Sequence, residues 1–288
     1  MVVTVAATQM SCGWDVAANI AQAEALVRSA HAQGAQIIVL PELFERCYFC
    51  QHQDYEFLKF AAPLAENAAV RHFQQIAHDL QVVLPISFYE RANQALYNSV
   101  AVIDADGSML GVYRKSHIPD GPGYSEKFYF TPGDTGFRVW PTAYGRLGVG
   151  ICWDQWFPES ARAMALLGAD LLCYPTAIGS EPQDPTLDSS THWRNTQCGH
   201  AAANLMPLIA SNRTGREQIG DTQIDFYGQS FIANETGTGV ALLDAVETGV
   251  ALASFDWAAL AHKRQSWGLF RDRRPDLYEV LLTKDGQP

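Results

Sequence analysis

The sequence predicts an α/β fold in which helices cover the faces of sheets, and three observations support this prediction. Short runs rich in β-branched residues alternate with runs of helical period across the first two-thirds of the chain. Hairpin-like meanders between them indicate that part of one sheet packs against another sheet. The chain is 288 residues long and 48% hydrophobic, and no low-complexity or Pro/Ser-rich linker divides it. We therefore expect a single domain over residues 1–288.

The first strand–helix–strand unit occupies the N-terminal 42 residues. Residues 2–9, "VVTVAATQ", predict a strand, and their lack of a basic leading segment argues against a signal peptide. Residues 15–33 predict a helix, with Asp15 as its N-cap and Gly34 as its C-terminal stop. Residues 36–42, "QIIVLPE", predict a continuous buried strand.

The remaining elements follow the same alternation. We expect helices over residues 66–79, 158–167 and 190–204, the second of them started by a proline. We expect strands over residues 82–90, 96–104, 109–115, 146–153, 169–177, 207–213, 226–234 and 249–255. No apolar run reaches the roughly 18 residues that a membrane span needs.

Charge and cysteine content narrow the possible partners and the compartment. The formal net charge of -11 argues against a nucleic-acid surface and is compatible with a cationic ligand, and without a spanning apolar run we expect no membrane partner. The six cysteines are few for this length, so we expect a reducing, cytoplasmic environment. Cys47 and Cys50 form a CxxC, but no second pair completes a zinc set, so we expect two loop cysteines and no metal.

Three reactive side chains fall at the ends of expected strands: Glu42, Lys115 and Cys152. Because carboxyl ends of strands in α/β sheets converge on one crevice, we expect these side chains to lie together. A thiol is nucleophilic only as the thiolate, so Cys152 needs a base and a nearby cation. Glu42 and Lys115 supply these two groups. Singly, each residue also fits an ordinary reading, as a loop carboxylate, a surface lysine and a core cysteine.

The context of these residues resembles a known family. The stretches "LPELFERCY" (40–48), "YRKSHIPDGPGYSEKFYFTPGDTGF" (113–137) and "GVGICWDQWFPESARAMALLGADLLCYPTAIG" (148–179) resemble the nitrilase superfamily of carbon–nitrogen hydrolases. The resemblance places the superfamily's Glu–Lys–Cys triad on Glu42, Lys115 and Cys152, and its additional glutamate, which helps to position substrate, on Glu126. It implies a four-layer αββα sandwich with two mixed sheets and helices on the outer faces.

The resemblance also implies an assembly and a reaction. Subunits of this superfamily pair through the outer helices near the cysteine, so we expect a homo-oligomer, with the tail at about 265–288 in subunit contacts. The loop after Lys115 and the tail "FRDRRPDLY" are most similar to the members that hydrolyse N-carbamoylputrescine, a cationic ureido compound of polyamine synthesis. Putrescine, ammonia and carbon dioxide are the implied products. Such a reaction requires neither a metal nor an organic cofactor.

An ammonium at the far end of such a substrate needs a carboxylate, because burying an unpaired charge is costly. Glu181 is the first candidate, since it follows the strand next to that of Cys152, and Asp120 and Glu126 lie in the loop after Lys115. The alternative for Glu181 is an ordinary surface carboxylate. The residues expected to form the walls around the methylene chain are Tyr48, Trp153, Ala177 and Ile178.

Two alternatives remain open. A substrate with a terminal carboxylate, such as an N-carbamoyl amino acid or β-ureidopropionate, would need a basic residue at the pocket. The candidates by position are Arg46, Lys127, Arg194 and Arg213. A non-catalytic binding protein on the same scaffold would have a broken triad, whereas all three positions are filled here.

Overall fold

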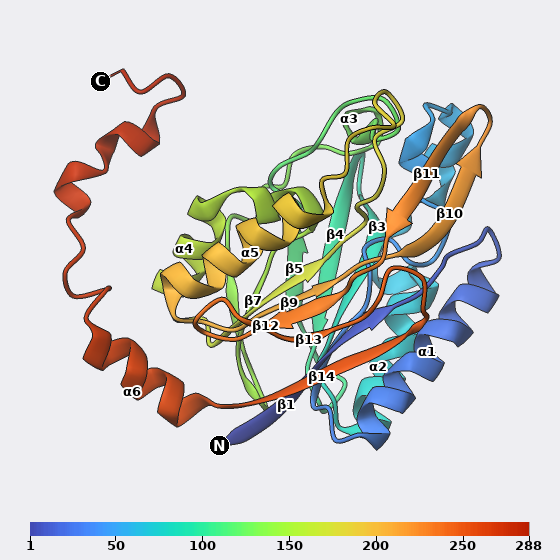
Figure 1. The fold of residues 1–288 in the computed structure, drawn as a ribbon. Coiled ribbons are helices and arrows are strands. Elements are labelled where there is room, and N and C mark those ends of the chain that lie inside the picture. The colour runs from blue at the N-terminus through green and yellow to red at the C-terminus, as the bar shows by residue number, and fades with distance from the viewer. Residues whose placement is uncertain (288) are drawn as a thin grey trace.

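Two sheets packed face to face form the centre of the molecule, and helices cover both outer faces (Figure 1). This arrangement confirms the expected order of layers, helix–sheet–sheet–helix. The computed structural model describes residues 1–287, so Pro288, the last residue of the expected domain and tail, lies outside the described residues.

The first sheet combines two three-stranded groups, β14-β1-β2 and β3-β4-β5. A parallel bridge between Ile37 and Val83 joins them. Parallel and antiparallel pairs occur together, since β1 runs parallel to β2 and antiparallel to β14. The strand bounds are β14 (Gly249–Asp256), β1 (Val2–Gln9), β2 (Ile37–Val39), β3 (Leu84–Ala92), β4 (Ala95–Ile103) and β5 (Met109–Arg114).

The second sheet has six strands in the order β13-β12-β9-β8-β7-β6, of which β7, β8 and β9 are parallel. A separate hairpin, β10 (Thr214–Ile219) and β11 (Thr222–Tyr227), extends from it. The six strands are β13 (Gly239–Leu242), β12 (Phe231–Ala233), β9 (Leu208–Ser211), β8 (Leu171–Pro175), β7 (Gly145–Val149) and β6 (Val139–Thr142).

The helices divide between the two outer faces. On the first sheet lie α1 (Val16–Ala32) and α2 (Ala68–Leu80), and on the second lie α4 (Pro158–Leu166) and α5 (Ser190–Asn204) (Figure 1). The start of α1 agrees with the predicted cap, because the Asp15 side chain accepts a hydrogen bond from the Ala18 N–H. A short helix, α3 (Glu126–Tyr129), follows the loop after β5, and α6 (Trp257–Trp267) leads into an extended tail (Figure 1).

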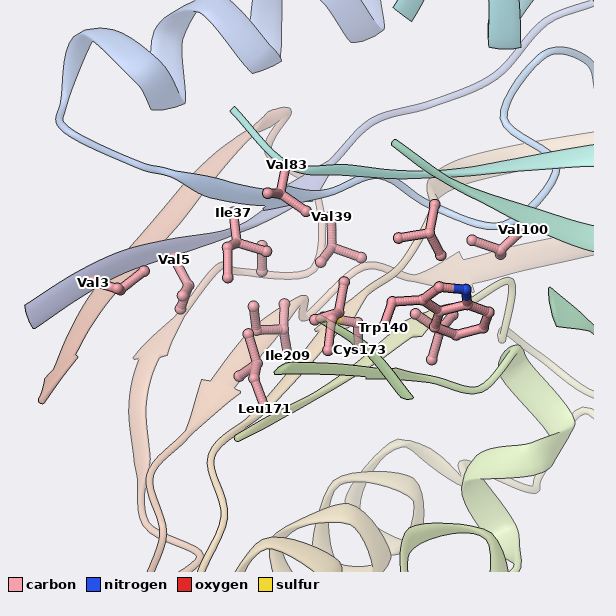
Figure 2. Close-up of a cluster of buried hydrophobic side chains, with 14 of the residues drawn as sticks. Val3, Val5, Ile37, Val39, Val83, Val100, Trp140, Leu171, Cys173 and Ile209 are labelled. Carbon is pink, nitrogen blue, oxygen red and sulfur yellow. The ribbon is translucent and has the colours of Figure 1, made fainter. Parts of the chain in front are cut away.

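The core between the sheets follows from the two-residue period of the strands. Val3 and Val5 of β1 point between the sheets, whereas Ala6 points toward α1 and α2. Leu171 and Cys173 of β8 likewise point inward and meet Ile209 from β9 (Figure 2). Because these strands are buried on both faces, their sequences are continuous apolar runs. Burial of each such valine or leucine side chain contributes about 1.5–3 kcal/mol to stability.

Some expected boundaries were wrong, and backbone geometry gives the reason. The strand expected over 36–42 ends at Val39, because the chain turns at Leu43, which has φ 49°. The strand expected over 226–234 is two strands, β11 and β12, since Gly228 (φ 59°) and Gln229 (φ 54°) break it. The strands β6, β10 and β13 and the helix α6 had no clear signal in the sequence. Over residues 1–287, no helix is long and apolar enough to span a membrane.

Candidate active site

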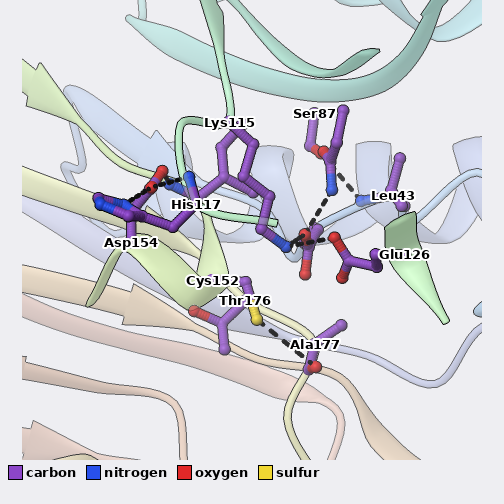
Figure 3. Close-up of polar contacts among 12 residues, drawn as sticks. Leu43, Ser87, Lys115, His117, Glu126, Cys152, Asp154, Thr176 and Ala177 are labelled. Atoms are coloured by element: carbon purple, nitrogen blue, oxygen red, sulfur yellow. Dashed lines mark hydrogen bonds and ion pairs between the residues drawn. The ribbon is translucent and has the colours of Figure 1, made fainter. Parts of the chain in front are cut away.

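Four charged or nucleophilic side chains meet where strands of both sheets end. Lys115 follows β5, and its Nζ lies 2.8 Å from Glu42 Oε1 and 2.7 Å from Glu126 Oε2 (Figure 3). Glu42 and Glu126 are fully buried, Lys115 is 1% exposed and Cys152 is 6% exposed. The structure thus brings together all four residues that the sequence placed in the catalytic set.

The two oxygens of Glu42 have different environments. Oε1 accepts hydrogen bonds from Lys115 Nζ and from Asn98 Nδ2, the latter at 2.6 Å. Oε2 is buried and has no partner among residues 1–287. Since a buried carboxylate oxygen without a donor is rare, this atom is available to accept a proton from a reacting group.

Cys152 lies three residues beyond β7, and not at the end of a strand as expected, because β7 ends at Val149. It begins a 3₁₀ helix, Cys152–Trp156, in which its own φ is 41°. A left-handed conformation of a non-glycine residue costs about 1–3 kcal/mol, and such strain clusters at functional sites. The thiol donates to the Ala177 carbonyl oxygen over 3.6 Å (Figure 3).

Asp154 holds this turn against the end of β5. One carboxylate oxygen accepts from the Ile151 N–H at 2.9 Å and from the Tyr113 hydroxyl at 2.8 Å. The other accepts from the His117 N–H at 3.0 Å and lies 2.7 Å from the His117 Nδ1 (Figure 3). Asp154 therefore fixes the cysteine turn relative to the strand that carries Lys115.

The electrostatics of the cluster keep the thiol protonated at rest. Burial, and next the negative charge of Glu42, raise the pKa of Cys152 well above its ordinary value, against the opposing effect of Lys115. Burial lowers the pKa of Lys115, but the charges of Glu126 and Glu42 outweigh it, so the pKa is raised and the ammonium is retained. Burial raises the pKa of Glu126 to about 7. A nucleophilic thiolate would therefore need a neighbouring base to accept the thiol proton.

Tyr48 lies behind the cluster and not in the wall where it was expected. Its side chain is fully buried, and its hydroxyl donates to Glu126 Oε1. The backbone N–H of Tyr48 donates to Glu217, which also pairs with Arg213 at 2.8 Å. Tyr48 therefore orients Glu126 and does not face the cavity.

A cavity of about 380 Å³ opens above Cys152. Trp153, 40% exposed, lies at its rim, and Trp156, Ala177 and Ile178 supply further apolar surface. Its acidic lining residues are Asp120, Glu126 and Glu181. One histidine, His192, also lines it. Among the described residues, no lysine or arginine lines this cavity.

The basic residues considered for a carboxylate substrate lie elsewhere. Arg213 is fully buried, and its guanidinium donates to the carbonyl oxygens of Glu42, Leu43 and Arg46. Arg46 itself lies over the Phe60 ring at 4.5 Å. Arg213, one of the candidates by position, is therefore not free to bind a substrate carboxylate, because its donors already bind the backbone that carries Glu42. The other two candidates, Lys127 and Arg194, do not line the cavity either.

Sequence reasoning missed three supporting residues: Asn98, Asp154 and Arg213 in its backbone-binding role. The position of Asp154, two residues after the candidate nucleophile, is the sequence signal that could have identified it as a supporting residue. Asn98 and Arg213 gave no such signal, since each lies far in sequence from the residue that it holds.

Cys47 and Cys50 are both buried and unpaired. In the part of the chain that the structure describes, residues 1–287, no group of three His, Cys, Asp or Glu side chains is arranged to hold a metal.

Comparisons with known proteins agree with this geometry. The family model described as carbon-nitrogen hydrolase matches residues 4–265. A relative from Arabidopsis thaliana, named N-carbamoylputrescine amidase, is 59% identical over 99% of this chain and 96% of its own. A relative from Francisella tularensis, named citrullinase, is 50% identical over 98% of this chain and 99% of its own. The crystal structure of a carbon-nitrogen hydrolase from Helicobacter pylori G27 superimposes with a TM-score of 0.92 at 38% identity, covering 99% of both chains.

Proposed function

Since the chain belongs to the carbon–nitrogen hydrolase family of the nitrilase superfamily, we propose that it hydrolyses N-carbamoylputrescine to putrescine, ammonia and carbon dioxide. The observation that carries this proposal is the charge of the cavity above Cys152, which has carboxylates and no lysine or arginine among its described lining residues. Such a lining favours a cationic tail. The relatives named N-carbamoylputrescine amidase, 57–60% identical, support the same substrate.

The first half of the reaction forms a covalent intermediate. Cys152 transfers its thiol proton to Glu42 Oε2 while the sulfur attacks the ureido carbonyl carbon. Lys115 and the backbone N–H of Trp153 stabilise the oxyanion. The carbon–nitrogen bond to the terminal amino group then breaks, and Glu42 protonates the nitrogen, which leaves as ammonia. The product on the enzyme is a thiocarbamate between Cys152 and the aminobutyl chain.

The second half returns the enzyme to its starting state. Glu42 takes a proton from water, and the resulting hydroxide attacks the thiocarbamate carbon. The carbon–sulfur bond breaks and the sulfur regains the proton. The released carbamic acid loses carbon dioxide without help, and its nitrogen becomes the second amine of putrescine.

We assign the aminobutyl chain of the substrate, with its distal ammonium, to the rim of the cavity. Glu181 and Asp120 both line it, and their carboxylates can pair with the distal ammonium, while Trp153 and Ile178 contact the methylene chain. Burial raises the pKa of Glu181, and the only hydrogen-bond partner of its carboxylate among residues 1–287 is Gln183 at 3.2 Å. A cationic tail would complete its pairing.

A pair of substrates that differ by one carboxylate tests the proposal. Citrulline has the same ureido chain as N-carbamoylputrescine, with a carboxylate added on the carbon that carries the amine, and N-carbamoyl-β-alanine has a carboxylate alone. We expect ammonia release from N-carbamoylputrescine with a kcat/KM at least about 100-fold above that for either acid, since one unpaired charge costs several kcal/mol. Preference for citrulline, in line with the relative named citrullinase, would overturn the substrate assignment.

The proposal extends to a homo-oligomer that pairs through α4, α5 and the tail. A groove of about 650 Å³ lies between these elements, lined in part by Leu166, Leu269 and Leu281. Three residues that line it, Arg162, His200 and Asn204, each have a buried side-chain polar atom without a partner among residues 1–287. The tail projects away from the sheets (Figure 1) and exposes apolar side chains such as Leu277 and Leu282. A second copy would cover these groups, and sedimentation analysis tests it.

We further propose a cytoplasmic enzyme of polyamine synthesis formed by one domain over residues 1–288. The six unpaired cysteines support a reducing compartment.

A further inference from the structure

Residues 177–181, here called the rim segment, follow β8 and form part of the wall of the catalytic cavity. The backbone of the rim segment pairs with β11. The Ser180 N–H donates to the Asp225 carbonyl oxygen at 2.9 Å, and the Tyr227 N–H donates to the Ile178 carbonyl oxygen at 3.1 Å. The Asp225 N–H also donates to the Ser180 hydroxyl at 3.0 Å. The hairpin that contains β11 therefore supports the rim segment along its length.

Tyr124 makes a second connection to the rim segment. Its hydroxyl accepts a hydrogen bond from the Gly179 N–H at 3.1 Å and donates one to the Ser180 carbonyl oxygen at 3.2 Å. Neither of these backbone groups has another hydrogen-bond partner within residues 1–287. Burial, and next the negative charge of Glu181, raise the pKa of Tyr124 well above its ordinary value. The hydroxyl therefore keeps the proton that it donates.

Tyr124 also belongs to the loop that leads to Glu126, and it lines the catalytic cavity. Its carbonyl oxygen accepts from the Glu126 N–H at 2.8 Å, where α3 begins. The rim segment begins with Ala177, whose carbonyl oxygen accepts from the Cys152 thiol, and it ends with Glu181. The Tyr124 hydroxyl thus joins the loop of the buried ion cluster to the segment between the nucleophile and the carboxylate at the rim.

We propose that Tyr124 is a positioning residue that selects substrates by the length of their chain. The proposal rests on the proposed function, in which Cys152 attacks the ureido carbon and Glu181 pairs with the distal ammonium. The Tyr124 hydroxyl keeps Glu181 at a fixed separation from the reacting carbon, and a binding group has to be held within about 0.5 Å of its productive position. A shorter chain leaves the two charges apart, and a longer chain has to bend. The fixed span therefore favours one chain length, that of N-carbamoylputrescine.

A series of ureido amines with three, four and five methylene groups tests this role. We expect the wild type to prefer the compound with four, N-carbamoylputrescine, by at least about tenfold in kcat/KM over each neighbour. Tyr124→Phe keeps the ring in the wall and removes both hydrogen bonds to the rim segment. It should reduce this preference to about threefold or less through a higher KM for N-carbamoylputrescine. Hydrolysis of N-butylurea, which has no ammonium, should change by less than about twofold, because the backbone bond from Tyr124 to Glu126 remains.

Hydrogen exchange in the rim segment is a second readout, and it needs no turnover. The Gly179 amide should exchange at least about tenfold faster in Tyr124→Phe, because it loses its acceptor. Tyr144→Phe is the matched control. Its hydroxyl donates to the Gln81 carbonyl oxygen at 2.7 Å, and Tyr144 lies between β6 and β7 and does not line the cavity. Tyr144→Phe should change neither the exchange of the rim segment nor the preference for chain length.

Three outcomes would overturn the proposal alone. The first is an unchanged preference for chain length in a folded Tyr124→Phe protein, and the second is unchanged exchange of the Gly179 amide. The third is an equal loss of activity toward all three ureido amines and N-butylurea, which would make Tyr124 a general structural residue. Failure of the proposed function is distinguishable, because the wild type itself would then release no ammonia from any compound of the series, and the role of Tyr124 would fall with it.

Discussion

The charged side chains in the buried centre and at the open rim of the catalytic cavity differ in burial and in pairing. In the centre, Glu42, Lys115 and Glu126 are at most 1% exposed, and both carboxylates pair with the Lys115 ammonium. At the rim, Asp120 is exposed and Glu181 is half-buried with a single glutamine partner. In the centre, Glu42, Lys115 and Cys152 lie at most three residues beyond a core strand and Glu126 begins α3, whereas the rim is built from loops. Reaction chemistry is therefore fixed by the fold, and substrate choice is left to segments that can change without disturbing it.

The largest effect should come from the nucleophile. Cys152→Ala should lower ammonia release by at least about 10⁴-fold, because no other group can form the covalent intermediate. Cys198→Ser is the matched control, since Cys198 is unpaired and lies on α5, outside the catalytic cluster. Near-wild-type turnover by a folded Cys152→Ala protein, with folding checked by circular dichroism, would contradict the mechanism.

Breaking the buried ion cluster should affect both stability and activity. Lys115→Met leaves two carboxylates buried without their cation, so the free energy of unfolding should fall by about 3–5 kcal/mol. Loss of the oxyanion partner should also lower kcat by about 10²–10³-fold. The double variant Lys115→Met/Glu126→Gln should regain part of the stability and none of the activity. Denaturant unfolding and ammonia assays separate the two effects, and unchanged stability in Lys115→Met would argue against the ion cluster.

The turn that carries the nucleophile offers an intermediate effect. Asp154→Asn replaces one carboxylate oxygen by an amide nitrogen that cannot accept, so either Ile151 and Tyr113 together or the His117 N–H lose their acceptor. A small displacement of Cys152 should lower kcat by up to about 10²-fold with little change in KM. The rate of Cys152 alkylation should fall in parallel. If KM rose while kcat stayed constant, Asp154 would belong to substrate binding and not to positioning.

The rim should show a smaller and more selective effect. Glu181→Gln should raise KM for N-carbamoylputrescine by about fivefold to tenfold, since a partly exposed ion pair contributes about 1 kcal/mol. Hydrolysis of N-butylurea, which lacks the ammonium, should not change. Asp120→Asn is the companion variant at the same rim. Equal effects of Glu181→Gln on both substrates would remove Glu181 from tail binding.

The pH dependence should give the smallest effect and should also separate the two regions. Burial raises the pKa of Glu181 above its ordinary value of 4.5. As the pH falls toward this raised pKa, the carboxylate takes up a proton and its attraction for the ammonium is lost. The ratio of kcat/KM for N-carbamoylputrescine to that for N-butylurea should therefore decrease as the pH decreases. In Glu181→Gln the same ratio should change less with pH. A flat ratio in the wild type would leave tail recognition to other groups.

The sequence predicted the centre better than the rim, and the reason is physical. Glu42, Lys115 and Cys152 follow apolar strand runs, and such runs can be recognised in a sequence because strands buried on both faces are continuously apolar. The family resemblance then supplied Glu126 and the layers. Tyr48 could not be placed, because its hydrogen bond to Glu126 depends on how two loops pack. Arg213 stayed among the candidates for binding a substrate carboxylate, since a sequence gives no sign that a guanidinium donates its hydrogen bonds to backbone carbonyl groups.

Pairing between β1 and β14 joins residues 2–9 to residues 249–256 in an antiparallel ladder, while β2, which leads to Glu42, pairs with the other edge of β1. During translation, β1 therefore keeps one edge unpaired until almost the whole chain has been made, and such edges favour aggregation. The segment that carries Glu42 thus depends on a strand that is synthesised last. A nascent chain that stops before Gly249 should need a chaperone and should have no reactive site, so catalytic competence arises only when synthesis is nearly finished.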